Sequence, residues 1–443
     1  MARARLCPRL RAVPIPGIRK WRGLKSLVHD AVDATTELVD VGHESTMRTV
    51  RGVTDHVEPL RTPVRLLDGV RRISTRGVLG TIKIVNRTVQ VVTDVALDAA
   101  ERAYPEPDGG GTREALPMRS DATATATGAW VGDAALGLVN AAVGDHLSDR
   151  GNGLDMDMVF RVNDRYVALD PDVLLEVAPS ASPKVALFVH GLGTTEWSWC
   201  LEAEAYHGDP GISFGSLLAR DLGYTPVYLR YNTGRRVAQN GRLLADELAR
   251  FIDAYPVPIE DLTLIGHSMG GLVLRSACHY GAEAERAWTS QVQRVFCLGT
   301  PHRGAPLAKL GHALTGVLDA IDLPGTQIGA RILGGRSAGI KDLRHGAVVD
   351  EDWLDVDPEL ANDATLLPTA RHYFMSATVT EDPEHPLGRL IGDLMVRVPS
   401  SAGPTLKEAH FAIETSRYGG VLHHQLQNHP ALYEQVRDAC AEP

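Results

Sequence analysis

The sequence predicts an α/β fold in which a mostly parallel central sheet is flanked by helices. Two observations support this prediction. From about residue 155 onward, short runs of Val, Leu, Ile and aromatic residues alternate with longer amphipathic segments, the pattern that repeated βαβ units produce. In addition, the first of these runs, Lys184–His190, is apolar almost throughout, as expected for a strand that helices cover on both faces.

The predicted elements follow one another along the second half of the chain. Strands are expected at 184–190, 226–231, 262–265, 294–298, 373–379 and 410–415. Helices fit between or after them at about 213–222, 239–255, 269–281 and 430–440, and a short helix of small apolar residues precedes the sheet at about 129–148.

The segment from about 305 to 371 is too long for a simple connection between two strands. It mixes apolar runs with the pair Gly334-Gly335. We interpret it as a cap or lid over a substrate pocket. The alternative is an insertion that only packs on the sheet.

The first quarter of the chain differs in character. Between Leu66 and Val92, apolar residues recur mostly at steps of three and four, so residues 1–104 are expected to be a basic arm followed by helices. Residues 105–127 are rich in Pro, Gly, Ala and Thr and are predicted to be a linker to a domain at 128–443. Residues 1–30 carry eight basic side chains and one acid, which suits either a solvated tail or an arm that contacts anionic lipid headgroups.

Bulk composition excludes little beyond nucleic-acid binding by the whole protein, which a net charge of −10 disfavours. The five cysteines are odd in number and form no C-x-x-C pair, so a reducing compartment is the simplest interpretation. We see no convincing signal peptide and no apolar run of the roughly 18 residues that a spanning helix needs. We therefore expect a cytoplasmic protein, and association with a membrane surface stays open.

The most informative motif is Gly266-His267-Ser268-Met269-Gly270, which follows the strand predicted at 262–265 and precedes a helical run. A G-x-S-x-G sequence between a strand and a helix is typical of a nucleophile elbow, a sharp turn that exposes the serine above the edge of the sheet. The glycines allow neighbouring backbone to approach closely. Ser268 is therefore the predicted nucleophile, supported by Gly266, His267 and Gly270.

A second motif supplies the hydrogen-bond donors that acyl transfer requires. His190-Gly191-Leu192-Gly193 directly follows the first predicted strand. In such a site, one backbone N–H comes from the residue after the nucleophile, here Met269, and another comes from the loop after an earlier strand, here Leu192.

The acid and the base are expected later in the chain, in the order serine, acid, histidine. Candidates for the acid are Asp393 and, directly after the fifth predicted strand, Glu381 and Asp382. The base is expected in the loop before the last helix, where His423 is favoured over its neighbour His424. His429 is set aside because Pro430 after it suits the first turn of a helix.

These motifs together resemble the α/β-hydrolase superfamily, and within it bacterial lipase or esterase proteins related to the GPI inositol-deacylase group. The resemblance runs from about Gly144 to the C-terminus and includes the stretches GDHL (144–147), FVHGLG (188–193), RYNTGR (230–235), NGR (240–242), LIGHSMGG (264–271) and LGTPHRGAP (298–306). It favours Asp393 as the acid, although Leu394 replaces a glycine of the family pattern and the proline comes later. It also places the base six residues before the histidine of a His-Pro pair, at His423.

The resemblance implies esterase or lipase activity on a small-molecule or lipid ester. We expect a Ser268–Asp393–His423 triad that forms an acyl-enzyme, with no metal or cofactor required. Thioesterase, amidase or peptidase activity on the same scaffold stays open. A different class of function, a catalytically silent scaffold at a membrane surface, is the other alternative.

Overall fold

The computed structural model describes residues 124–305, 337–353, 366–401 and 413–442, together with Gly23, Lys25, Ser26 and Arg113–Glu114. The helices predicted between 27 and 104 lie outside the described residues, and so do residues 306–336 and 354–365 of the predicted lid. The chain forms two compact units, one of residues 1–109 and 150–154, the other of residues 110–149 and 155–443. In the first unit, Nδ2 of Asn152 donates to the carbonyl of Gly23 over 3.0 Å.

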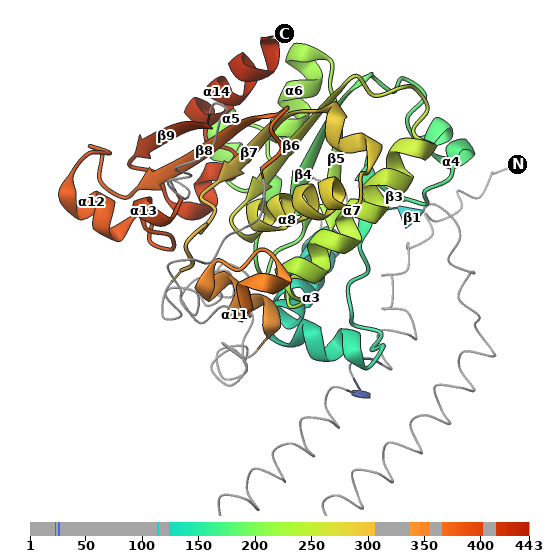
Figure 1. Cartoon of the computed structure of the whole chain (residues 1–443), viewed down its shortest axis with the longest axis horizontal. Helices are drawn as coiled ribbons and strands as arrows, with labels where there is room; N and C mark the ends of the chain where they lie inside the picture. The colour runs from blue at the N-terminus through green and yellow to red at the C-terminus, as the bar shows by residue number, and fades with distance from the viewer. Residues whose placement is uncertain are drawn as a thin grey trace, which may run out of the picture. The chain divides into compact units, whose positions relative to one another are not determined.

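The second unit is built on a sheet in which nine strands are described, in the order β1-β3-β2-β5-β4-β6-β7-β8-β9 (Figure 1). The strands are β1 (Arg113–Glu114), β2 (Val159–Val162), β3 (Arg165–Val167), β4 (Lys184–Val189), β5 (Thr225–Arg230), β6 (Asp261–His267), β7 (Val292–Leu298), β8 (Arg371–Thr378) and β9 (Ile413–Gly419). Neighbouring strands pair in parallel along the sheet from β5 through β4, β6, β7 and β8 to β9. Strands β1, β2 and β3 add an antiparallel edge next to β5. The predicted α/β-hydrolase fold, with its mostly parallel sheet, is confirmed.

Helices cover both faces of the sheet. The described helices are α3 (Ala124–Asp149), α4 (Pro171–Val177), α5 (Ala203–His207), α6 (Phe214–Leu222), α7 (Val237–Ala254), α8 (Met269–Glu283), α11 (Ala338–His345), α12 (Pro386–Ile391), α13 (Val398–Ser401) and α14 (Pro430–Ala441). Short 3-10 turns lie at η1 (Glu196–Cys200), η2 (Ala287–Gln291), η3 (Asp350–Trp353) and η4 (His423–Gln427). Among the described residues, no helix is both long enough and apolar enough to cross a membrane.

Strand β4 explains why the core has two halves. Its side chains alternate between faces, as strand geometry requires. Val185, Leu187 and Val189 pack in the same cluster as α7 and α8, whereas Ala186 and Phe188 pack in the cluster that includes α6 and α14. All five are essentially inaccessible to solvent, and complete burial of a large apolar side chain stabilises the fold by roughly 1.5–3 kcal/mol.

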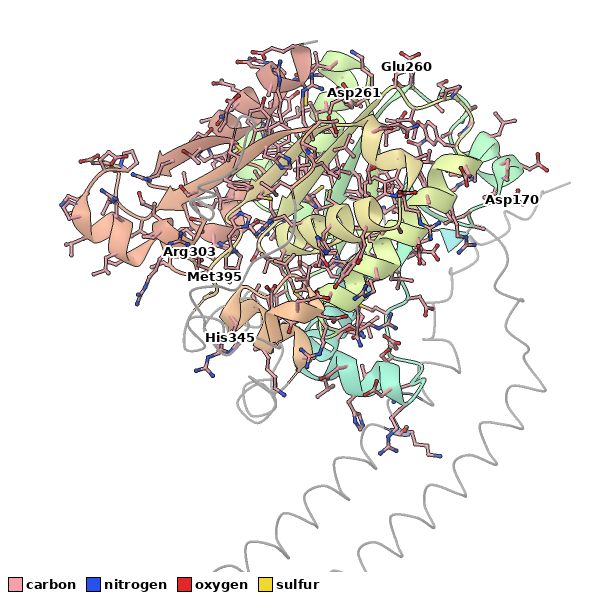
Figure 2. All side chains as sticks on the ribbon, in the orientation of Figure 1. Asp170, Glu260, Asp261, Arg303, His345 and Met395 are labelled. Carbon is pink, nitrogen blue, oxygen red and sulfur yellow. The ribbon has the colours of Figure 1, made fainter. Side chains whose placement is uncertain are left out.

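The order of the strands determines where a ligand can bind. The chain passes from β4 to β5 on one side and then returns to β6 on the other side of β4. Ligands of open α/β sheets bind at such a switch point, beyond the carboxyl ends of the strands. In Figure 2, Arg303 and Met395 lie at this end of the sheet, and Glu260 and Asp261 lie at the opposite end, where β6 begins.

The structure differs from the sequence predictions at the edges of the sheet. Strands β1, β2 and β3 were not predicted, because two to four residues are too few for a periodic pattern to appear. The last strand begins at Ile413 and extends to Gly419, beyond the range of 410–415. Helix α3 begins at Ala124, inside the range predicted as a linker, because alanine favours helix strongly.

The described part of the predicted lid packs on the body of this unit. The Ser337 hydroxyl donates to the carbonyl of Ala141 over 2.6 Å, and Asp342 accepts from the backbone N–H of Val237 over 2.7 Å. These bonds attach α11 to α3 and to the start of α7. Whether the segment covers a substrate stays a prediction.

Candidate active site

Ser268 occupies a strained turn between β6 and α8. Its backbone has φ 54° and ψ −122°, a conformation that residues other than glycine rarely adopt. The backbone N–H of Ser268 donates to the carbonyl of Leu298, at the end of β7, over 2.8 Å. Such strain persists only where surrounding structure holds it, and it is concentrated at functional sites.

The glycines on either side make this turn possible. A Cβ atom on Gly266 would lie 2.6 Å from the backbone nitrogen of Gly271, and one on Gly270 would overlap the carbonyl oxygen of Val189 at the end of β4. No side chain fits at either position without displacing backbone. The spacing of the motif is therefore a packing requirement of the turn and of the β4–α8 contact.

Asp393 and His423 form the central polar contact of the site. His423 Nδ1 lies 2.7 Å from Asp393 Oδ2, and both residues are buried, with 4% and 1% of their surfaces exposed. The other carboxylate oxygen of Asp393 accepts from the backbone N–H groups of Met395 and Val396 over 3.0 and 2.8 Å. An ionised carboxylate only accepts hydrogen bonds. In this contact Nδ1 of His423 therefore carries a proton and donates to Asp393.

The surroundings of His423 place it beside the nucleophile turn. Nε2 of His267, the residue before Ser268, lies 3.0 Å from the carbonyl oxygen of His423, and the two rings are 4.6 Å apart. A Cβ on Gly299 would lie 3.1 Å from His423 Cε1, and Gly299 directly follows Leu298, the partner of Ser268. Nε2 of His423 is buried and has no hydrogen-bond partner among the described residues.

The rival residues lie elsewhere. The side chain of His424 is 47% exposed, with its Nε2 3.4 Å from the carboxylate of Glu202. Glu381 and Asp382 are exposed, and Asp382 accepts from the backbone N–H of Glu384 within its own loop. The structure brings Asp393 to His423 and leaves these three residues outside that contact.

Two backbone segments lie next to Ser268. A Cβ on Gly191, in the loop after β4, would lie 3.1 Å from Cβ of Ser268, so Leu192 follows a residue in contact with the nucleophile. Met269 is the first residue of α8. The first N–H groups of a helix have no intrahelical acceptor, and the helix dipole favours negative charge there. This arrangement suits an oxyanion that develops beside Ser268.

Burial lowers the pKa of the remaining histidines of the motifs. Burial lowers the pKa of His190 to about 4, and its Nδ1 lies 3.0 Å from the carbonyl oxygen of Gly191. Burial and the neighbouring His423 hold the pKa of His267 well below its usual value. Burial also lowers the pKa of His302, whose Nδ1 accepts from the Arg275 guanidinium over 3.0 Å. Because carbonyl oxygens only accept, His190 Nδ1 and His267 Nε2 carry the protons.

Sequence reasoning did not single out a buried ionic cluster next to the loop after β4. Arg230 donates to Glu196 over 2.8 and 3.0 Å and to Asp133 of α3 over 2.7 and 2.6 Å. Arg161 and the Tyr166 hydroxyl also donate to Glu196, over 3.1 and 2.6 Å. The sequence feature that could have indicated this cluster is Arg230, a charged residue at the end of the mostly apolar strand β5.

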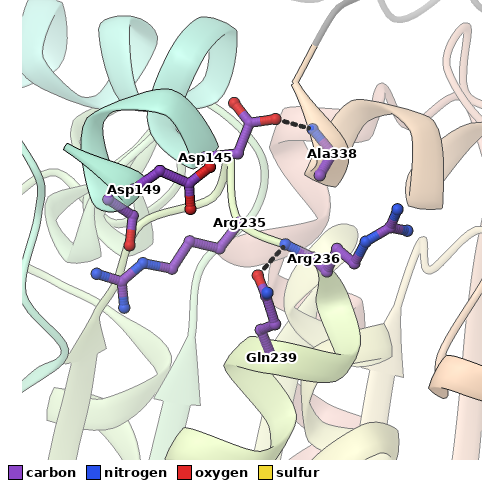
Figure 3. A pocket seen from close by; sticks show the side chains of 7 residues that line it. Asp145, Asp149, Arg235, Arg236, Gln239 and Ala338 are labelled. Atoms are coloured by element: carbon purple, nitrogen blue, oxygen red, sulfur yellow. Dashed lines mark hydrogen bonds between the residues drawn. The ribbon is translucent and has the colours of Figure 1, made fainter.

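A pocket of about 300 Å³ lies between the ends of α3, α7 and α11 (Figure 3). Its lining consists of Asp145, Ser148, Asp149, Arg235, Arg236, Gln239 and Ala338. Asp145 accepts from the backbone N–H of Ala338 over 2.8 Å, and Arg235 pairs with Asp155 over 2.6 Å. Ser268 and His423 do not line this pocket, which is therefore distinct from the candidate active site.

Comparisons with known proteins agree with the resemblance noted in the sequence. Residues 185–327 match the family model described as the PGAP1-like alpha/beta domain, which confirms the resemblance over that segment. Comparison with curated proteins found no match.

Several solved structures are similar at low identity. The lipase BlEst2 of Bacillus licheniformis is 18% identical, with 58% of this chain and 94% of that chain covered at a TM-score of 0.40. An esterase of Pyrobaculum calidifontis is 15% identical, with 68% and 89% covered at 0.33. The RedJ thioesterase of the prodiginine biosynthetic pathway in Streptomyces coelicolor is 16% identical, with 59% and 88% covered at 0.35.

Proposed function

We propose that this protein is a serine hydrolase that cleaves carboxylic esters through an acyl-enzyme formed on Ser268. The observation that supports this most strongly is the buried Asp393–His423 hydrogen bond beside a serine in a strained strand-to-helix turn. A buried carboxylate and a histidine with a free Nε2 are costly to assemble. Nucleophilic catalysis by a serine requires such a pair, because the histidine takes the serine proton and the carboxylate orients the histidine.

The proposed reaction has two steps. His423 Nε2 takes the hydroxyl proton of Ser268 as the oxygen attacks the ester carbonyl, and Asp393 stabilises the imidazolium that forms. The tetrahedral oxyanion accepts hydrogen bonds from the backbone N–H groups of Leu192 and Met269, each worth roughly 3–4 kcal/mol in comparable sites. His423 then gives its proton to the leaving alcohol, which leaves an ester on Ser268.

Water completes the cycle. His423 takes a proton from a water molecule, which attacks the acyl-enzyme and forms a second oxyanion in the same position. When this intermediate collapses, the proton returns from His423 to the Ser268 oxygen, and the carboxylic acid is released. No step needs a group beyond the three side chains, the two backbone donors and water.

The test is labelling and turnover with a matched pair of serine variants. Wild-type protein should react with a fluorophosphonate probe and hydrolyse p-nitrophenyl esters, and Ser268→Ala should do neither while remaining folded. Ser290→Ala is the control, because Ser290 is exposed in the 3-10 turn before β7. A folded Ser268→Ala protein with near-wild-type turnover would falsify the proposal.

The choice of substrates separates the related activities. Esters of increasing acyl length are assayed beside thioesters and short peptides with the same acyl group. Higher kcat/KM on thioesters or peptides would keep the mechanism and change the substrate class. If the wild-type protein neither labels nor turns over any of them, the scaffold function becomes the better account.

A further inference from the structure

The motif Arg230-Tyr231-Asn232-Thr233, which the proposed mechanism does not use, lies beside the loop that would supply Leu192 to the oxyanion. We call residues 190–196 the β4 loop and residues 230–233 the β5 segment. Strands β4 and β5 are parallel neighbours, with Val189 paired with Leu229. The β4 loop and the β5 segment therefore leave the same edge of the sheet side by side.

Three hydrogen-bonding contacts join the β5 segment to the β4 loop along its length. At the start of the loop, the Tyr231 hydroxyl donates to the carbonyl of His190 over 2.9 Å. In the middle, the Thr233 hydroxyl accepts from the backbone N–H of Gly193 over 3.3 Å. At the end, Arg230 binds the Glu196 carboxylate through two nitrogens, over 2.8 and 3.0 Å. Leu192 lies between the first two contacts.

The contacts are buried, which makes them expensive to break. Tyr231, Thr233 and Glu196 are fully buried. Burial alone would raise the pKa of the Glu196 carboxyl, but the charges and hydrogen bonds of Arg230 and Arg161 lower it, so Glu196 is ionised at neutral pH. When a buried polar group loses its partner, the fold is destabilised by the full desolvation free energy of that group, because water cannot replace the partner. The three contacts therefore constrain the β4 loop.

Helix α3 closes the other side of the β4 loop. Asp133 accepts from Arg230 and also from the Thr195 hydroxyl, over 2.9 Å. A Cβ on Gly137 would lie 2.9 Å from the carbonyl oxygen of Gly193, so the helix backbone contacts the loop directly. The loop is thus enclosed by α3 and the β5 segment.

The β4 loop needs this external support because of its own composition. Leu192 stands between Gly191 and Gly193, and glycine gives the backbone the greatest conformational freedom. An oxyanion donor is effective only when it is already in position before charge develops. A displacement of about 1 Å in such a site can cost roughly a hundredfold in rate.

We propose that Tyr231, Thr233 and Arg230 are positioning residues that hold the backbone N–H of Leu192 in place for the oxyanion. The proposal rests on the proposed function, because it requires that an oxyanion forms on Ser268. It accounts for three residues of the RYNTGR motif by one physical role. Asn232, in the same motif, has other partners: its Nδ2 donates to the carbonyl of Gly144 over 2.8 Å and to Asp155 over 2.6 Å.

The principal test removes the acceptor for Gly193. Thr233→Val keeps the shape of the side chain and removes the hydroxyl, whereas Thr233→Ser keeps the hydroxyl. We expect Thr233→Val to lower kcat by about tenfold to a hundredfold with little change in KM, and Thr233→Ser to stay close to wild type. Thr263→Val is the matched control, because Thr263 is an equally buried threonine near the start of β6 that bonds Asp261.

Binding of an alkyl trifluoromethyl ketone separates positioning from stability. This inhibitor adds to the serine and presents an oxyanion to the same donors, so its affinity should fall by the same factor as kcat/KM in Thr233→Val. Tyr231→Phe should behave similarly, and Tyr224→Phe, which loses a buried hydroxyl bonded to Asp261, should not. Each value is measured on protein shown to be folded by its circular dichroism and melting curve.

The outcomes distinguish the two proposals. If Thr233→Val and Tyr231→Phe melt earlier but keep wild-type kcat and inhibitor affinity, the contacts only stabilise the fold and the positioning role is wrong. If neither variant folds, Arg230→Lys decides: wild-type kcat and inhibitor affinity in the folded Arg230→Lys protein contradict the positioning role. If the wild-type protein shows no hydrolysis that depends on Ser268, both proposals fail together.

Discussion

The carbonyl oxygen of His423 accepts a hydrogen bond over 3.0 Å from Nε2 of His267, the residue directly before Ser268. One residue of the nucleophile turn therefore holds the backbone of the loop that carries the candidate base. The imidazole of His423 is held separately by Asp393 over 2.7 Å. Backbone and side chain of His423 are thus oriented by two different partners, and Nε2 is left without a partner among the described residues.

The two adjacent histidines should differ strongly in their effect on catalysis. We expect His423→Ala to lower kcat by several orders of magnitude, about as much as loss of Ser268, because the members of a triad act as a unit. His424→Ala should stay within about threefold of wild type, since its side chain is half exposed and faces Glu202. Steady-state hydrolysis of a p-nitrophenyl ester measures both. An inactive His424→Ala protein beside an active His423→Ala protein would reverse the assignment.

The candidate acids can be compared in the same assay. Asp393→Asn keeps the size of the side chain but removes the charge and allows the amide to donate, so His423 should adopt the wrong tautomer. We expect kcat to fall by roughly four orders of magnitude, the cost of this change in a serine protease. Asp382→Asn is the control, because Asp382 is exposed and bonds only within its own loop among the described residues. Equal losses in both variants would contradict the role of Asp393.

Backbone strain at Ser268 should be visible in stability. A residue with a Cβ at φ 54° costs about 1–3 kcal/mol relative to an unstrained conformation. Ser268→Gly relieves this strain. The glycine also raises the entropy of the unfolded chain, which lowers the free energy of unfolding by a smaller amount, roughly 0.4–1 kcal/mol. We expect Ser268→Gly to unfold at higher urea concentration than Ser268→Ala, which keeps the Cβ. A Ser268→Ala protein at least as stable as Ser268→Gly would show that the turn carries no strain worth measuring.

His190 should make stability depend on pH below neutrality. Burial lowers its pKa to about 4 in the folded protein, from 6.5. Between these values the unfolded chain binds the extra proton, so the free energy of unfolding decreases as pH falls from 6.5 to 4. Over this range His190 should lower the free energy of unfolding by about 3 kcal/mol, since each unit of pKa difference corresponds to about 1.36 kcal/mol.

The measurement for His190 is a difference between two proteins. His190→Asn keeps a side-chain N–H donor for the carbonyl of Gly191 but does not titrate. The unfolding free energy of wild type minus that of His190→Asn, from urea titrations at pH 7, 5.5 and 4, should decrease steadily toward pH 4. A difference that is independent of pH would mean that His190 is accessible to protons in the folded state.

The parts of the fold that local patterns determine were predicted well. The apolar run of β4 and the alternation of β5–β8 with α6, α7 and α8 follow from periodicity within single segments. Pro430 begins α14, as expected from its missing N–H and fixed φ. The elbow could be located because Gly266 and Gly270 each avoid a clash that any side chain would cause.

Contacts between distant segments decided the rest. Residue chemistry alone does not separate His423 from His424 or Asp393 from Asp382, and the sequence favoured His423 and Asp393 only through the motif resemblance. The folded structure determines that Asp393 meets His423, whereas His424 faces Glu202. The short edge strands exist because β2 pairs with β5 across more than sixty residues. The Arg230–Glu196 contact likewise needs two parallel strands to end side by side. Periodicity is a local property of the sequence. Burial and the pairing of charges depend on which strand ends the sheet brings together, and only the folded structure determines that.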